Sequence, residues 1–248
     1  MNRSLAKHLI LLIGVFALVR MWPMMQFEPW SDWQVFEARK LNQYGWLERQ
    51  GALLDVHYLT GVVPRPELHN YPNHPAPIHW VNMIFERLFG GWGVIGFNML
   101  IGLATSTLAL LALRQSYGAG IALLGALLFT IAPSGIIYDV DANQGAFGAA
   151  IWPIAALLLS STLSIRFRAV LLGAACLLAG QATWMVWPVF GALLIGAWGV
   201  AWDRRFSATP SKPLIVALLV GGGLTVLFFV LQVLVYTPDW LNLARYME

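Results

Sequence analysis

The sequence is poor in charged residues and contains a single cysteine. Asp, Glu, Lys and Arg make up 11% of its 248 residues, whereas apolar residues make up 58%. An ordinary soluble domain is about 45–50% apolar, so the composition excludes that class and predicts an integral membrane protein. The formal net charge is +3, and the chain has no block of like charges. Nucleic acid is therefore not an expected partner.

Cysteine usage and the N-terminus exclude further classes. Because the single Cys176 lies inside an apolar run, the sequence predicts no intrachain disulfide and no multi-cysteine metal site. The N-terminus has basic residues ahead of an apolar run, as a signal peptide does, but no small-x-small cleavage site precedes Arg20. We interpret this segment as an uncleaved first membrane span.

Apolar segments of membrane-spanning length recur along the chain. A helix needs about 20 apolar residues to cross the hydrocarbon layer. Such segments lie at about 8–25, 92–113, 118–137, 145–164 and 213–236. A further 34 residues between Arg168 and Asp203 are uncharged, and as one helix they would be about 51 Å long. Since the hydrocarbon layer is only about 30 Å thick, the segment 169–202 is predicted to be a hairpin of two short spans.

The distribution of basic residues supports a total of seven spans. With the hairpin, one side of the membrane holds eight Lys and Arg residues and a single acid, Asp203, and the positive-inside rule makes that side cytoplasmic. The basic residues are Arg3, Lys7, Arg114, Arg166, Arg168, Arg204, Arg205 and Lys212. The sequence thus predicts one all-α transmembrane domain over 1–248, with a cytoplasmic N-terminus and an extracytoplasmic C-terminus.

The extracytoplasmic side is predicted to carry one long loop, at about 26–90, and short loops near 138–144 and 181–187. Because functional residues concentrate in loops, we expect the function in the long loop. Its Trp and Tyr residues are typical of a membrane interface.

Two amphipathic helices are predicted in the long loop. Ser31 and Gln34 form an S-x-x-Q capping box at the head of a helix from about Asp32 to Tyr44. A second helix is expected after Pro77, through IHWVNMIFERLFG. Both are expected to lie on the membrane surface.

Asp32 is the first candidate for chemistry, because it stands at the first turn of a helix close to the end of the first span. One interpretation is structural: an acid there complements the positive end of the helix dipole. The other is catalytic: an ionised carboxylate beside the membrane acts as a general base. Glu28 lies nearby and is a possible supporting acid.

Histidines cluster in the same loop, and the spacing of three of them, His69, His74 and His79, is five residues. Helical zinc ligands need a spacing of three or four, and the intervening prolines forbid a helix, so no metal site is expected. With Arg65, His74 or His79 could donate hydrogen bonds to an anionic group at the membrane surface. The alternative is a proline-rich loop with interfacial histidines.

A second pair of acids, Asp139 and Asp141, directly follows the third span. Acids at the hydrocarbon boundary are costly unless they face water or a functional site. The alternative is that they are solvated caps for the fourth span.

The order of these segments resembles the GT-C fold glycosyltransferases. The first span is followed by P-W-S-D-W-x-x-F-x-A-x-x-L-x-x-x-G, from Pro29 to Gly45, and Y-P-N-H-P-A-P-I stands at 71–78 before the second span. The acidic loop after the third span completes the pattern, which covers nearly the whole chain. The family includes the protein O-mannosyltransferases and the lipid A aminoarabinose transferase. The resemblance implies a seven-span GT-C-like module with two interfacial helices in its first outer loop, and we expect it in a bacterial inner membrane.

The resemblance also implies roles for single residues. Asp32 falls on the first-loop acid, which acts as the base on the acceptor, and Asp141 or Asp139 falls on the second-loop acid. Tyr71 and His74 fall on a Y-x-x-H-P element near the donor lipid, where Arg65 and His79 are further candidates.

The implied enzyme is a hexosyl- or pentosyltransferase that uses a polyprenyl-phosphate sugar. It transfers the sugar to a lipid, glycan or protein acceptor by direct displacement with inversion. No flavin, haem or nucleotide cofactor is implied, while a divalent metal at Asp32, Asp139 or Asp141 stays open. Family members usually continue with more spans or an outer domain, so a further subunit or C-terminal region is an expected partner. The alternative function is a non-catalytic membrane subunit or lipid-binding partner with a GT-C-like shell.

Overall fold

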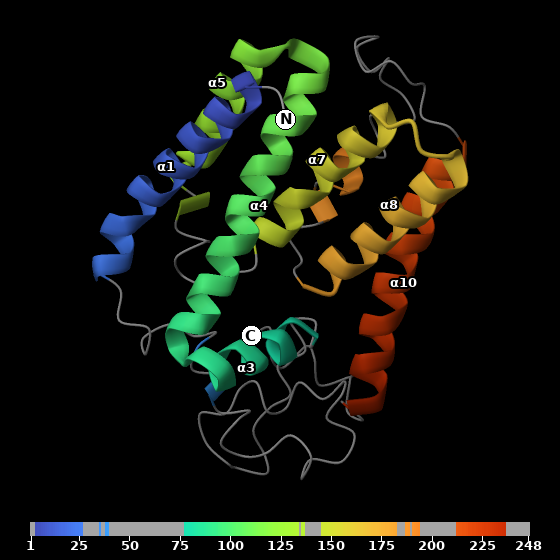
Figure 1. Cartoon of the computed structure of the whole chain (residues 1–248). Helices are drawn as coiled ribbons and strands as arrows, with labels where there is room; N and C mark the ends of the chain where they lie inside the picture. The colour runs from blue at the N-terminus through green and yellow to red at the C-terminus, as the bar shows by residue number, and fades with distance from the viewer. Residues whose placement is uncertain are drawn as a thin grey trace.

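In the computed structural model, the described residues fold into helices and short turns (Figure 1). The described residues are 3–26, 35, 38–39, 77–133, 135–136, 145–182, 187–188, 190–193 and 212–236. Their helices are α1 (Arg3–Gln26), α3 (Pro77–Phe89), α4 (Gly91–Tyr117), α5 (Ala119–Thr130), α7 (Gly145–Ser160), α8 (Ile165–Gly180) and α10 (Lys212–Tyr236). No strand occurs among the described residues, so the all-α prediction is confirmed for that part of the chain.

Three of these helices are long and apolar enough to cross a membrane. The segments are Arg3–Met25 in α1, Gly91–Tyr117 in α4 and Pro213–Leu231 in α10. Their outward faces carry large apolar side chains, of which Ile10 and Met25 are 70% and 74% exposed. Extended apolar surface is uncommon on soluble monomers and suits hydrocarbon surroundings. The chain is therefore a membrane-embedded helical protein.

The other predicted spans coincide with shorter helices. α5 ends at Thr130, although the apolar sequence continues to about 137, and α7 ends at Ser160. α8 ends at Gly180, where Gln181 and Ala182 form a turn. Because much of the chain beyond this turn lies outside the described residues, the hairpin and the total of seven spans stay predictions.

α4 is the central helix of the bundle. It contacts α1, α3, α5 and α7, whereas α8 and α10 pack against each other beyond α7 (Figure 1). Gly118, with φ 78°, allows α5 to turn back along α4, and Gly90, with φ 68°, allows α3 to lie across the start of α4. The start of α1 meets the end of α4, where His8 Nδ1 lies 3.4 Å from Arg114 Nη1. We call the opposite end, where α3 lies and α4 begins, the α3 end.

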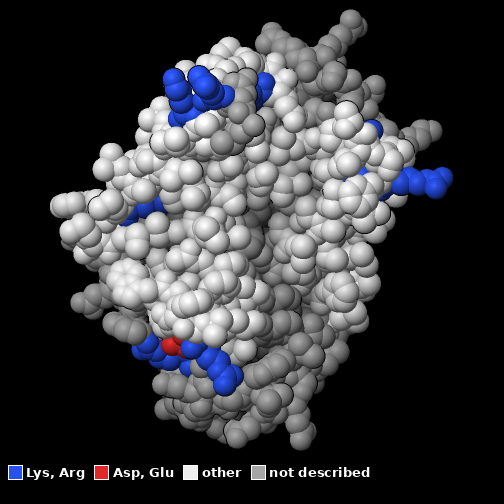
Figure 2. Space-filling view, in the orientation of Figure 1, with Lys and Arg blue, Asp and Glu red and all other residues white. Residues whose placement is uncertain are grey.

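Basic side chains gather at the two ends of the bundle, with few between them (Figure 2). Arg3 and Lys7 lie in the first turns of α1, and Arg114 lies in the last turn of α4. Arg87 lies in the last turn of α3, at the α3 end. Most of the buried side chains described inside the bundle are apolar, and Arg20 is a buried basic side chain among them.

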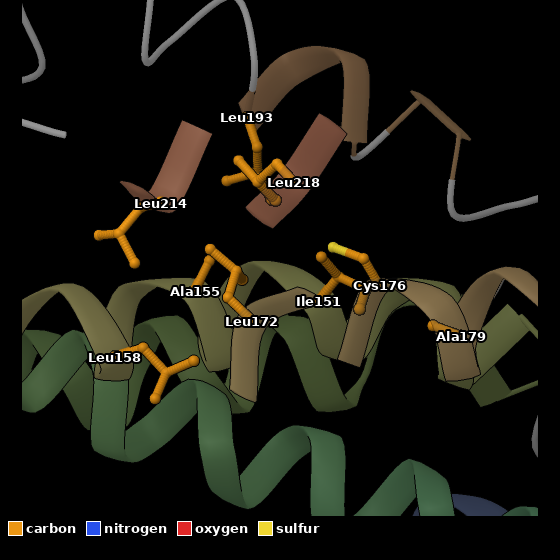
Figure 3. Close-up of a cluster of buried hydrophobic side chains, with 9 residues drawn as sticks. All are labelled: Ile151, Ala155, Leu158, Leu172, Cys176, Ala179, Leu193, Leu214 and Leu218. Carbon is orange, nitrogen blue, oxygen red and sulfur yellow. The ribbon is translucent and has the colours of Figure 1, made fainter. Parts of the chain in front are cut away.

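The largest apolar core joins α7, α8 and α10 (Figure 3). Its buried members are Ile151, Ala155, Leu158, Leu172, Cys176, Ala179, Leu193, Leu214 and Leu218. A second core, of Leu12, Leu110, Ala122 and Ala126, joins α1, α4 and α5. The first core holds α8 and α10 together with α7, and the second holds α1 and α5 against α4.

The contact between α8 and α10 depends on small residues. Ala217, Gly221 and Thr225 recur every four residues along α10 and lie against Gly173 and Gly180 of α8. A Cβ atom at Gly221 would lie 2.5 Å from the Gly173 carbonyl oxygen. Membrane helices associate through such close backbone approach, because lipid is as apolar as a neighbouring helix.

We expect Gly221→Val to destabilise the bundle, because its methyl groups would overlap the α8 backbone. Overpacking of this kind costs about 1–3 kcal/mol. Gly223→Val is the matched control, since a Cβ atom at Gly223 meets no atom within 4 Å. Thermal unfolding in detergent should show a lower melting temperature for Gly221→Val than for Gly223→Val. Equal melting temperatures would contradict the close contact.

Candidate functional site

Most predicted site residues lie outside the described residues. These are Glu28, Asp32, Arg65, Tyr71, His74, Asp139 and Asp141. His79 lies near the start of α3, where the backbone is described. The sharing of one site by these side chains therefore stays a prediction. The structure shows instead how the chain next to several of them is held.

The segment that follows Asp32 is anchored on the start of α4. Val35 and Ala38 are helical, and each is 1% exposed. They form a buried cluster with Val94 and Ile95 of α4. Because residues three apart share one face of a helix, Val35 and Ala38 present a single apolar face to α4. The chain three residues after Asp32 thus has a fixed place at the α3 end.

An ion pair joins the same segment to α3. Arg39 Nε donates to Glu86 Oε1 at 3.4 Å, and the Arg39 and Glu86 side chains are 36% and 11% exposed. Glu86 is the single acid within the described residues. Because Glu86 is largely shielded from the surroundings, salt and water screen this pair less than a fully exposed one. The first-loop segment is therefore tied to both α3 and α4.

Glu86 of α3 faces the bundle, whereas several apolar side chains of α3 face outward. Ile78 and Asn82 are buried, whereas Ile84 and Leu88 are 51% and 65% exposed. On the bundle side, the Phe85 ring stacks on Phe97 of α4 at a centroid distance of 4.4 Å. An outward apolar face suits contact with a bilayer. The second predicted loop helix corresponds to α3, while its location at the membrane surface stays a prediction.

Sequence reasoning assigned no role to Arg20, which is 2% exposed within the apolar helix α1. Its Nη1 donates to the Thr130 carbonyl oxygen at 3.1 Å, and its guanidinium carbon lies 3.6 Å from the centroid of the Phe16 ring. Thr130 is the last residue of α5, and the last carbonyl groups of a helix have no partner within it. The signal for Arg20 was present in the sequence, because a charge inside an apolar span is costly and marks a candidate functional residue.

Asn98 and Thr225, two other buried polar residues, bond to carbonyl groups of their own helices. Asn98 Nδ2 donates to the Val94 carbonyl oxygen at 2.9 Å, and Thr225 Oγ1 donates to the Gly221 carbonyl oxygen at 3.0 Å. Such bonds within one helix satisfy a polar side chain in an apolar bundle. Across the described ranges, no group of three or more His, Cys, Asp or Glu side chains could hold a metal ion.

No family model, curated protein or solved structure matches this chain. The resemblance to the GT-C glycosyltransferases therefore depends on the motifs and span order of the sequence. The described contacts show how the segment that follows Asp32 is held against α3 and α4.

We expect the Arg39–Glu86 pair to stabilise the α3 end, with a coupling free energy of about 1 kcal/mol or less, because Arg39 is partly exposed. A double-mutant cycle of Arg39→Ala and Glu86→Gln, followed by thermal unfolding in detergent, measures this coupling. Arg87→Ala is the control, since Arg87 is the exposed neighbour of Glu86. If the losses of stability in the two single variants add up to the loss in the double variant, the pair contributes nothing.

Proposed function

We propose that this chain is a membrane glycosyltransferase that moves a sugar from a polyprenyl phosphate to an acceptor on the extracytoplasmic face. The observation that carries the proposal is the double anchoring of the first-loop segment. Val35 and Ala38 pack on α4, and Arg39 pairs with Glu86 of α3. A general base must be held within hydrogen-bond reach of its substrate, and Asp32 stands three residues before this anchored segment.

Asp32 is the proposed general base. A hydroxyl or amine of the acceptor attacks the anomeric carbon of the sugar, and Asp32 takes the proton that the acceptor loses. The bond between the anomeric carbon and the lipid phosphate breaks, so the polyprenyl phosphate leaves with the bonding electrons and the anomeric configuration inverts. The acceptor is a lipid, a glycan or a protein, and Glu28 is a supporting acid.

Groups near the lipid phosphate stabilise the charge that develops on it as it leaves. Hydrogen-bond donors and cations aimed at such a charge contribute strongly in a water-poor site. Arg65, Tyr71, His74 and His79 are the proposed donor-binding residues, and Asp141 or Asp139 is the proposed second acid. A further subunit or chain segment would supply any additional cationic groups.

The proposed location is a bacterial inner membrane, with seven spans, a cytoplasmic N-terminus and an extracytoplasmic C-terminus. A polyprenyl-linked donor suits that outer face, because nucleotide sugars stay in the cytoplasm. The arrangement of charge supports this orientation: Arg3 and Lys7 of α1 lie toward the same end as Arg114 of α4, and the positive-inside rule makes such an end cytoplasmic.

We expect Asp32→Asn to abolish sugar transfer while folding and donor binding stay nearly unchanged. A positioned carboxylate that accepts a proton contributes about 10²–10⁴ in rate. Asparagine keeps the shape of the side chain and its capping ability but cannot accept the proton. The assay follows transfer from labelled polyprenyl-phosphate sugars by purified protein in vesicles supplied with envelope acceptors. Asp55→Asn is the control, because it removes an acid from the same loop that has no proposed role.

Two results would contradict parts of this proposal. If Asp32→Asn transfers sugar within about threefold of the wild type, Asp32 is not the base, and Asp139 or Asp141 becomes the candidate. If the wild type uses no polyprenyl-phosphate sugar, a non-catalytic subunit or lipid-binding partner explains the chain better.

A further inference from the structure

α5 is too short to cross a bilayer unaided. Its twelve residues, Ala119–Thr130, span about 18 Å, against about 30 Å of hydrocarbon. The chain then turns: the Ile131 N–H donates to the Leu127 carbonyl oxygen at 2.9 Å, and the Ile136 N–H donates to the Ala132 carbonyl oxygen at 3.1 Å. A helix end inside a membrane protein leaves carbonyl groups that need partners from elsewhere in the fold.

Arg20 reaches this helix end from α1. Its Nη1 donates to the Thr130 carbonyl oxygen at 3.1 Å, and a Cβ atom built on Gly135 would lie 4.0 Å from its Nη2. The two terminal nitrogens of one guanidinium thus lie beside the last turn of α5 and beside the chain that leaves it. Contact with the Phe16 ring at 3.6 Å fixes the guanidinium from the α1 side.

We propose that Arg20 is a positioning residue that fixes the start of the acidic loop relative to α1. Gly135 and Ile136 are the last described residues before Asp139 and Asp141, and α1 leads directly into the loop that holds Asp32. Arg20 therefore joins the helix that precedes the proposed base to the segment that precedes the proposed second acid. This inference rests on the proposed function for its catalytic consequence and on the contacts of Arg20 for its structural one.

The residue type supports this role. A methionine or leucine would fill the same position in an apolar span without the cost of a buried charge. A lysine would supply the charge as a single point, whereas the planar fork of arginine reaches two segments and still stacks on a ring. Positive charge also complements the negative end of the α5 dipole at Thr130.

The test compares Arg20→Met and Arg20→Lys with the wild type, and Met21→Leu is the control, because Met21 is an exposed neighbour on α1. The first readout is independent of activity. All proteins in this comparison carry Cys176→Ser and Ile136→Cys, so the rate of maleimide labelling at position 136 reports on the chain that leaves α5. We expect faster labelling in Arg20→Met, an intermediate rate in Arg20→Lys and an unchanged rate in Met21→Leu.

The second readout is kinetic. We expect kcat for sugar transfer to fall roughly ten- to hundredfold in Arg20→Met, because small displacements of reacting groups have effects of that size. The KM for the lipid donor should stay near that of the wild type, because the proposed donor-binding residues are in the other loop. If Arg20 had a merely structural role, Arg20→Met would lower the yield of folded protein, and the folded protein would not combine a lower kcat with an unchanged KM.

Failure of the positioning role and failure of the proposed function give different results. A labelling rate at position 136 that does not change in Arg20→Met overturns the positioning role, and so does an unchanged kcat in folded, active protein. If Arg20→Met does not fold, Arg20→Lys decides by the same two readouts. If the wild type transfers no sugar, the proposed function fails, while the labelling rates still support or overturn the positioning of the chain after α5.

Discussion

The hydrocarbon layer offers no hydrogen-bond partners, and this constraint acts on the apolar helices that lie within it. Backbone groups there must bond within the protein, which favours helices, and the described secondary structure is helical. Asn98 and Thr225 bond to carbonyl groups one turn earlier. Where α5 ends, Arg20 bonds to the carbonyl group of Thr130. The same constraint favours contacts between small residues, such as Gly173 and Gly221, because burial of apolar surface gains little against lipid.

The α3 end is where the described structure departs from a plain apolar bundle. There the first-loop segment is held by two kinds of contact, apolar packing of Val35 and Ala38 on α4 and the ion pair between Arg39 and Glu86. Apolar packing fixes the face of a helix, and a paired charge fixes its register against a neighbour. If Asp32 is the proposed base, a neighbouring segment held in both ways would give it the defined position that catalysis requires.

Much of the fold follows from the sequence, because the lengths of the apolar segments and Pro77 predict the places of α1, α3, α4 and α10. The early end of α5 could not be predicted, since apolar composition fixes which residues tolerate lipid and not where a helix stops. The hydrogen bond from Arg20 to Thr130 ends on a backbone carbonyl group, which has no sequence signature. The Arg39–Glu86 pair joins residues 47 positions apart, so it depends on how α3 folds back. For the candidate site, the residues and their chemistry stay predictions from the sequence, and the structure describes how neighbouring segments are anchored.

Under the proposed function, this membrane protein consumes a lipid-linked sugar outside the cytoplasm. The most direct measurement is a comparison of envelope lipids and glycans, by mass spectrometry, in cells with and without the gene for this chain. Loss of the chain should cause one polyprenyl-phosphate sugar to accumulate and the same sugar to disappear from one envelope lipid, glycan or protein. Both changes should reverse when the wild-type chain is restored. Identical lipid and glycan profiles in the two strains would contradict the claim.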